Sequence, residues 1–249
     1  MRKERERLVA GLVTVVEELS AACARLRFGE PVAHVYDPLD YAREAATAYL
    51  AKWARARPTA LLLGMNPGPF GMVQTGVPFG EVAAVREWLG IDGGVRTPRA
   101  AFAARPVEGF ACTRSEVSGR RVWGWAKERF GTPERFFERF FVWNYCPLAF
   151  LEEGGRNRTP DKLPAAERDA LYAVCDRALV QVVELIDPRF VIGVGRFALD
   201  RARSALPAGH GRTLGTILHP SPASPIANRG WAPQAERQLV ALGVALGSE

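Results

Sequence analysis

The sequence predicts an α/β domain in which helices cover both faces of a parallel sheet. Two short segments, residues 59–63 (TALLL) and 189–195 (RFVIGVG), are apolar almost throughout, as expected of strands that are buried on both faces. Stretches with helical periodicity separate these segments along the chain. The chain has 249 residues, 48% of them hydrophobic, which suffices for one such core. We therefore expect a single domain over residues 1–249.

Two helices are expected before the first of these strands. Apolar residues near the N-terminus recur at the spacing of one helix face: Leu8, Leu12, Val15, Leu19, Cys23 and Leu26. Glutamates interrupt this stretch, which favours an amphipathic surface helix over a signal peptide. A second helix is expected over residues 38–56, with Asp40 near its start and Pro58 closing it.

The rest of the chain continues this alternation of helices and strands. Helical patterns cover residues 81–90, 119–131, 133–140, 165–186 and 196–206. Further strands are expected over residues 141–148 (FVWNYCPL) and 213–220 (TLGTILHP). Residues 152–164 combine turn-forming and charged residues, which predicts a loop.

Three loops are expected to meet at one edge of the sheet. In parallel sheets the working residues lie beyond the carboxyl ends of the strands. Residues 64–80 (GMNPGPFGMVQTGVPFG), the end of 141–148 and residues 219–231 (HPSPASPIANRGW) all follow expected strands. Long loops in compact domains are uncommon unless they bind something, although the glycines and prolines of residues 64–80 also suit a stiff turn.

The charge and cysteine content narrow the class of partner. A formal net charge of +6 and a pI near 9.4 favour a polyanion such as nucleic acid. The four cysteines form no CxxC pair, so we expect neither a metal site nor an iron–sulfur cofactor. No apolar run reaches membrane-spanning length, and we expect no membrane partner. If the protein is prokaryotic, we expect it in the cytoplasm, associated with the nucleoid. If it is eukaryotic, we expect it in the nucleus.

Several polar residues in these loops are candidates for chemistry. His219 lies among three prolines after an expected strand, where the alternative is a structural histidine. Asn144 interrupts an aromatic stretch and has the alternative of capping a loop. A further alternative is nucleophilic catalysis by Cys146 or Ser221, with His219 as the base. The sequence gives it little support, because neither residue lies in a recognised nucleophile turn. The basic residues of 113–129 are candidates for a phosphate path, with a solvated helix face as the alternative.

Six motifs together closely resemble one known enzyme family, the single-strand-selective monofunctional uracil-DNA glycosylases. The motifs are GMNPGPFGMVQTGVPFGEV, CTRSEVSGRRVWG, FVWNYCPLAF, GRNRTPDKLP, GVGRFALDRARSAL and HPSPASPIANRGW. The similarity runs from about Phe28 to the C-terminal region, so residues 1–27 form an N-terminal helix outside it. The first and last motifs are the most specific.

This resemblance implies a three-layer α/β/α sandwich with a central parallel four-stranded sheet. It also implies hydrolysis of the N-glycosidic bond of uracil, and of oxidised uracils such as 5-hydroxymethyluracil, in single- and double-stranded DNA. The products are an abasic site and free uracil, as in base-excision repair. Such enzymes need no metal or cofactor, and we expect a monomer.

The matching motifs also imply roles for individual residues. Asn66 is expected to position the attacking water, and His219 to donate a hydrogen bond to O2 of the departing base. Phe79 is expected to stack on the flipped base, and Asn144 to read the uracil edge through its amide. The pocket is further lined by Met65, Gly68, Phe70 and Met72. The DNA is contacted by Ser221, Pro222, Pro225, Ile226 and Arg229.

Two departures from the family pattern bear on these roles. Asn66 stands where other branches of the superfamily carry an aspartate, and its amide cannot act as a base near neutral pH. This substitution leaves open a second hypothesis, a non-catalytic DNA-binding module that senses modified bases. Ala223, Ser224 and Ile226 stand where family members often carry an arginine and a longer polar pair. The missing arginine argues against efficient opening of duplex DNA.

Overall fold

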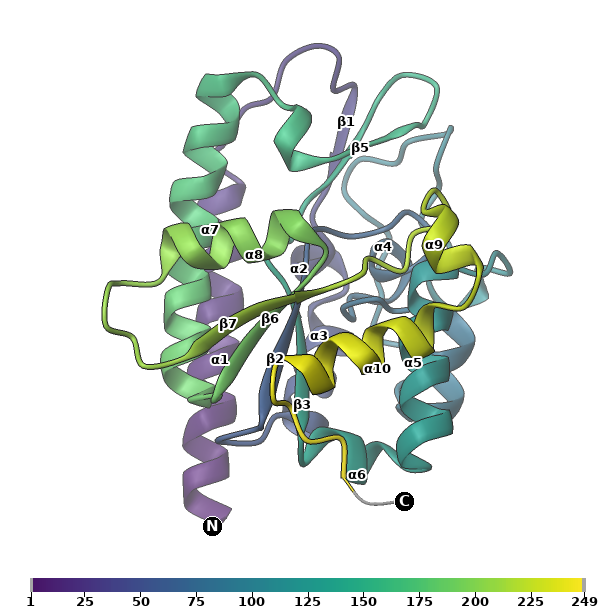
Figure 1. Cartoon of the computed structure of the whole chain (residues 1–249). Helices are drawn as coiled ribbons and strands as arrows, with labels where there is room; N and C mark the ends of the chain where they lie inside the picture. The colour runs from purple at the N-terminus through teal and green to yellow at the C-terminus, as the bar shows by residue number, and fades with distance from the viewer. Residues whose placement is uncertain (1, 248–249) are drawn as a thin grey trace.

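The centre of the molecule is a four-stranded parallel sheet in the order β3-β2-β6-β7 (Figure 1). The computed structural model describes residues 2–247. Every residue of the first three of these strands is buried, which accounts for their uninterrupted apolar sequences. The strands are β2 (Ala60–Gly64), β3 (Phe140–Asn144), β6 (Phe190–Val194) and β7 (Thr213–Ile217).

Helices pack on both faces of this sheet, so the predicted three-layer α/β/α sandwich is confirmed (Figure 1). One layer contains α1 (Arg2–Cys23), α7 (Ala165–Ile186) and α8 (Arg196–Ala205). The other contains α5 (Val117–Phe130), α6 (Pro133–Phe137) and α10 (Trp231–Ala241). Two short helices follow strands of the sheet: α4 (Met72–Thr75) and α9 (Pro225–Asn228).

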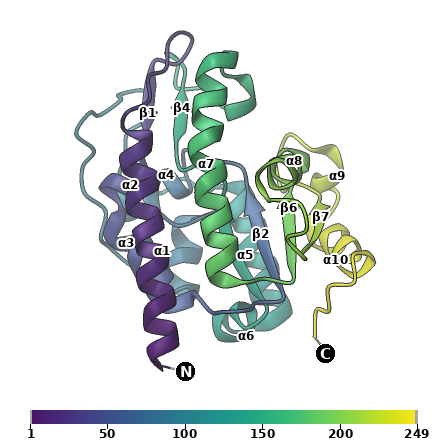
Figure 2. The same cartoon turned by 90° about the vertical axis from the view of Figure 1, so that its left-hand side faces the viewer.

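The predicted N-terminal helix is α1, which lies alongside α7 (Figure 2). It is amphipathic as expected, and its buried side joins the main hydrophobic core. The buried residues are Leu8, Leu12, Val15, Val16, Leu19, Ser20 and Cys23. Within residues 2–247, no helix combines the length and apolarity needed to cross a bilayer.

A second, antiparallel sheet was not predicted. It has three strands in the order β1-β4-β5, which are β1 (His34–Tyr36), β4 (Ala149–Leu151) and β5 (Asn157–Arg158). Strands of two or three residues are too short to show periodicity in a sequence. The expected loop over 152–164 was therefore wrong in part, because it contains β5 and a 3₁₀ turn, Pro160–Lys162.

Two helix predictions also need correction. The helix expected over 38–56 is divided at Ala42 into α2 (Pro38–Tyr41) and α3 (Arg43–Trp53). Asp40 lies in the first turn of α2 as expected, and Asp37 caps this helix, because its carboxylate accepts a hydrogen bond from the Leu39 amide at 3.0 Å. The helix expected over 81–90 is a single π-helical turn, Ala84–Trp88, and a 3₁₀ turn occupies Gly109–Ala111. Helices α9 and α10 were not predicted.

Candidate active site

The loops that follow β2 and β3 run side by side beyond the sheet. The Tyr145 amide donates to the Gly64 carbonyl at 3.0 Å, and the Cys146 amide donates to the Met65 carbonyl at 2.8 Å. Asn66 then reaches across, with its Nδ2 donating to the Leu148 carbonyl at 3.4 Å. The parallel register of the two strands therefore continues into the loops, as expected at the carboxyl edge of such a sheet.

Gly64 is the last residue of β2 and lies beneath the side chains of Asn144 and Phe79. It pairs with Asn144 in the strand register. A Cβ at Gly64 would overlap Asn144 Oδ1 and would lie 2.7 Å from Phe79 Cε2. Glycine is required here because the amide and the aromatic ring both occupy the space of the missing side chain.

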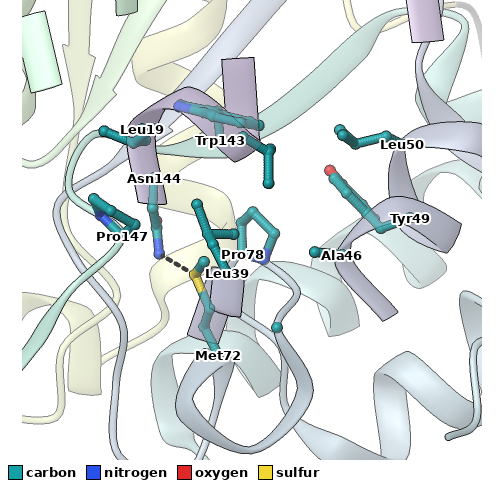
Figure 3. A pocket seen from close by; sticks show the side chains of 12 residues that line it. Leu19, Leu39, Ala46, Tyr49, Leu50, Met72, Pro78, Trp143, Asn144 and Pro147 are labelled. Atoms are coloured by element: carbon teal, nitrogen blue, oxygen red, sulfur yellow. Dashed lines mark hydrogen bonds between the residues drawn. The ribbon is translucent and has the colours of Figure 1, made fainter. Parts of the chain in front are cut away.

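The amide of Asn144 has a defined orientation. Its Nδ2 donates to Met72 Sδ at 3.2 Å (Figure 3), and a thioether sulfur can only accept. The Oδ1 atom therefore faces the space above Gly64. Asn144 is 6% exposed, so burial holds this arrangement away from bulk water.

An apolar cavity of about 20 Å³ lies behind Asn144 and Met72 (Figure 3). Helices α1, α2 and α3 supply much of its wall through Leu19, Leu39, Tyr49 and Leu50. Neither Phe79 nor His219 lines it. The cavity therefore lies on the core side of Asn144 and Met72, away from Phe79 and His219.

Phe79 is held in a strained backbone conformation by α5. Its φ is +53°, in the left-handed region, which costs a non-glycine residue on the order of 1–3 kcal/mol. The buried Trp123 donates from Nε1 to the Phe79 carbonyl at 3.0 Å. Gly119 brings the α5 backbone against the same carbonyl, where a Cβ would overlap the oxygen. Contacts with α5 thus offset the strain and fix the Phe79 ring over Gly64.

His219 carries a neutral ring whose Nε2–H is available as a hydrogen-bond donor. Its Nδ1 accepts from the Ser221 amide at 3.1 Å, so the ring proton lies on Nε2. Burial lowers the pKa of His219 from 6.5 to about 4. The ring centre lies 6.5 Å from that of Phe79, which joins the loop after β7 to the loop after β2.

Two further residues position the His219 loop. Gly195, at the end of β6, has a φ of +94°, and a Cβ there would lie 3.2 Å from the Cβ of His219. Arg121 of α5 donates from Nη1 to the carbonyls of Pro220 at 3.0 Å and Ser221 at 3.3 Å. Its Nη2 donates to Asn228 Oδ1 at 2.8 Å. Arg121 therefore ties α5 to both ends of the 219–228 segment.

Asn66 and Gly68 lie half-buried at the start of the loop after β2. Because Asn66 Nδ2 bonds to Leu148, its Oδ1 is the free end of the amide, and no group within residues 2–247 donates to it. A Cβ at Gly68 would lie 3.4 Å from Cδ of Glu116. The Glu116 carboxylate caps α5 by accepting from the amides of Ser118 and Gly119 at 3.2 and 2.7 Å. Burial raises the pKa of Glu116.

The structure places the remaining candidates around these groups. Met65 and Phe70 are half-buried, and Met72 is buried. In the DNA-contact group, Ser221 Oγ accepts from the Ala223 amide at 3.1 Å. The other members of that group are exposed and lie on or beside α9: Pro222, Pro225, Ile226 (53% exposed) and Arg229. Their contact with DNA stays a prediction, as do the roles of the site residues.

Other site chemistries have less support from the geometry. Cys146 is fully buried, and its Sγ bonds locally to the backbone of Leu148, away from any general base. Searching residues 2–247 finds no cluster of three or more histidine, cysteine, aspartate or glutamate side chains that could hold a metal ion. Sequence reasoning missed Arg121, Trp123, Gly195 and Glu116, because each acts through a contact between distant segments.

Comparisons with known proteins show the family of the chain. The model of the uracil DNA glycosylase superfamily matches residues 52–239. A single-strand selective monofunctional uracil-DNA glycosylase from Rattus norvegicus is 48% identical over 239 residues, covering 95% of this chain and 86% of the relative. The chain belongs to this family. Proteins of the same name from Mus musculus and Bos taurus are also 48% identical, covering 95% of this chain and 85% and 88% of theirs.

The resemblance, the fold and the enzyme class expected from the sequence are thereby confirmed. The alignments cover more of the chain than residues 28–249, so the similarity extends into α1. Pedobacter heparinus SMUG2 superposes with a TM-score of 0.63 at 15% identity, over 92% of this chain and 97% of that chain. At 15% identity the superposition supports the fold alone.

Proposed function

We propose that this uracil-DNA glycosylase hydrolyses the N-glycosidic bond of uracil and of oxidised uracils in single- and double-stranded DNA. The reaction leaves an abasic site and releases the free base, as the first step of base-excision repair. The observation that carries the proposal is the convergence of three groups at the end of β2: the Asn144 amide, the Phe79 ring and the neutral His219 donor. They supply edge recognition, a stacking face and charge stabilisation in one place.

Asn144 selects uracil in this mechanism. Uracil offers an acceptor at O4 and a donor at N3, which match the NH₂ and Oδ1 of an amide, whereas cytosine offers the reverse. Selection needs an amide that does not flip. The bond from Asn144 Nδ2 to Met72 Sδ supports a fixed orientation, with the second amide hydrogen and Oδ1 left for the base.

His219 and Asn66 act when the bond breaks. Negative charge develops on the departing uracil, and an Nε2–H aimed at O2 stabilises it without giving up its proton. The sugar gains positive character, and water then attacks it. The free Oδ1 of Asn66 can accept a hydrogen from that water and orient it, which an amide does without acting as a base. A cationic sugar is electrophilic enough to react with a neutral water that no base has deprotonated.

The space beside Gly68 supports acceptance of uracils with a polar group at C5. By the family match, Gly68 faces C5 of the base and leaves it uncovered. The Glu116 carboxylate borders the same space. A hydroxymethyl group can donate to a carboxylate, whereas the methyl group of thymine would only desolvate it. This favours 5-hydroxymethyluracil over thymine.

The proposed contact with DNA extends to the surface around α9. Pro225 and Ile226 project as an exposed apolar pair that suits a wedge between base steps. Backbone amides near Ser221, together with Arg229, suit phosphate contacts. We further propose that the protein works as a monomer, in whichever compartment holds the DNA.

Incubation with labelled oligonucleotides that carry one uracil tests this function. The expected result is release of free uracil and a strand that breaks in alkali, with no release from a matched strand carrying thymine. A second series with 5-hydroxymethyluracil tests the C5 proposal, and the variant Glu116→Gln should lower its rate relative to uracil. Tight binding to uracil-DNA without release of uracil would instead select the non-catalytic module.

A further inference from the structure

Two arginines approach the ring of Phe70 in the loop after β2. The guanidinium carbon of Arg114 lies 3.9 Å from the ring centre, and that of Arg105 lies 5.6 Å from it. In the described part of the chain, neither arginine forms an ion pair with a carboxylate. The ring face attracts each guanidinium, and no carboxylate within residues 2–247 offsets the two positive charges, so the arrangement suits an anion.

The surrounding backbone fixes this arrangement. Gln74 is 2% exposed, and its Nε2 donates to the carbonyls of Pro69 at 2.9 Å and Pro106 at 3.2 Å. Its Oε1 accepts from the amides of Glu108 and Gly109 at 2.8 and 3.1 Å. Since Pro69 precedes Phe70 and Pro106 follows Arg105, one buried amide sets the ring and the arginine side by side.

Arg105 also carries a buried donor without a partner. Its Nη1 donates to the Ala104 carbonyl at 2.8 Å, but its Nε is buried and unpaired. Leaving a buried donor unsatisfied is unfavourable, and more so when the group is charged. The carbonyl of Arg105 is anchored by Tyr36 Oη at 2.9 Å, so its backbone is held where this donor has no protein acceptor. An anion bound at the exposed edges of the two guanidinium groups would offset their positive charges.

We propose that Arg105 and Arg114 form a binding site for a backbone phosphate of the DNA strand that carries the target base. The inference rests on the proposed function, because DNA supplies the phosphate. Arg114 is exposed, so a strand lying on the surface can reach it. A guanidinium that lies on an aromatic face keeps its edge N–H groups free, and these can bond two phosphate oxygens at once.

This site lies close to the proposed chemistry in sequence and in space. Phe70 follows Asn66 by four residues, and Arg114 lies two residues before Glu116, which borders Gly68. Residues 221–229 form the other proposed DNA contact, from a different part of the chain. A phosphate held at Arg105 and Arg114 would therefore fix the strand at a second point and keep the target nucleotide over the loop after β2.

The salt dependence of binding to a uracil-free single strand tests the proposal independently of catalysis. Each phosphate contact contributes about 0.7 to the slope of log K against log salt concentration for single strands. We expect Arg114→Gln to weaken binding at low salt and to make this slope shallower by about 0.7. Arg7→Gln is the matched control, because Arg7 is exposed and lies in the first turns of α1, at the end of the molecule away from α4 (Figure 1).

The control variant separates a specific contact from general positive charge. Equal slope changes in Arg114→Gln and Arg7→Gln, or no change in Arg114→Gln, would overturn the proposal. Arg105→Gln, checked for folding by its thermal unfolding, should also make the slope shallower. Slower uracil release at saturating DNA with an unaltered slope would assign Arg114 to catalysis instead and likewise overturn it. Failure of the glycosylase function itself would appear only as intact uracil strands, which these binding measurements do not use.

Discussion

The neutral state of His219 leads to a prediction about the pH dependence of uracil release. If the neutral Nε2–H stabilises the departing base, the rate should not depend on His219 titrating near neutral pH. The single-turnover rate of the wild type is expected to show no inflection from His219 between pH 5.5 and 8. His219→Ala removes the donor and should slow release by about 10²–10³-fold, as for loss of one preorganised donor elsewhere.

The burial of His219 determines how strongly the folded protein favours the neutral ring. Burial lowers the pKa of His219 from 6.5 to about 4, which corresponds to about 3 kcal/mol in favour of the neutral form. At pH 6.5 the folded protein therefore holds one protonated ring in roughly 300. The hydrogen bond from the Ser221 amide to Nδ1 also acts only on the neutral ring, because a protonated Nδ1 cannot accept it.

Nitrogen NMR of the three histidines measures this state directly. The expected spectrum shows His219 protonated on Nε2 alone from pH 8 down to pH 5.5, with the signal assigned by its absence from His219→Ala. Protonation of both ring nitrogens at pH 6.5 would refute the reasoning. So would an inflection of the wild-type rate between pH 6 and 7 that is absent from His219→Ala.

The same shift predicts a pH dependence of stability. The unfolded chain binds a proton on His219 below pH 6.5, whereas the folded chain binds it only near pH 4. The contribution of His219 to the free energy of unfolding should therefore fall by up to about 3 kcal/mol as the pH is lowered from 6.5 to 4. Asp37 changes stability in the opposite direction over much of this range, so the test is the difference in free energy of unfolding between the wild type and His219→Ala. Denaturant unfolding should show this difference shifting by up to that amount against the wild type as the pH is lowered.

Three further variants test other parts of the account. Arg121→Gln frees the His219 loop and should lower kcat about tenfold with little change in KM; an unchanged kcat would remove Arg121 as a positioning residue. Asp37 has its pKa raised to about 6 by burial, so it destabilises the fold as pH rises through 6. The free energy of unfolding of Asp37→Asn relative to that of the wild type should therefore be higher at pH 8 than at pH 4, by up to about 3 kcal/mol, as measured by urea unfolding. Trp123→Phe loses the bond to the Phe79 carbonyl and should cost about 1 kcal/mol and raise KM; wild-type values for both would contradict that role.

The parts of the fold that the sequence revealed are those specified locally. The strand Phe190–Val194 is wholly apolar, and the expected helix over 165–186 is observed as Ala165–Ile186, because its buried face repeats over six turns. The strand Ala149–Leu151 pairs with His34–Tyr36, more than one hundred residues away, and with Asn157–Arg158, and strands of two or three residues show no period in the sequence. The antiparallel sheet was missed for this reason.

The candidate site shows the same division. Asn66, Phe79, Asn144 and His219 were found because their motifs follow strands, and the parallel sheet brings strand ends together. The residues that hold them in place were not found. The sequence of the helix that carries Arg121 is typical of a basic face exposed to solvent. In the structure, however, the Arg121 guanidinium donates hydrogen bonds to the carbonyls of Pro220 and Ser221, beside His219. Such a contact depends on how α5 packs, which only the assembled fold reveals.

The most direct test of the mechanism compares uracil release and DNA binding in the same variants. The wild type should convert a single-stranded uracil oligonucleotide fully to an alkali-labile product. Asn66→Ala and His219→Ala should each slow this conversion by about a hundredfold or more, with dissociation constants for the strand close to that of the wild type. Wild-type rates in either variant, or an intact strand after incubation with excess wild-type protein, would contradict the account.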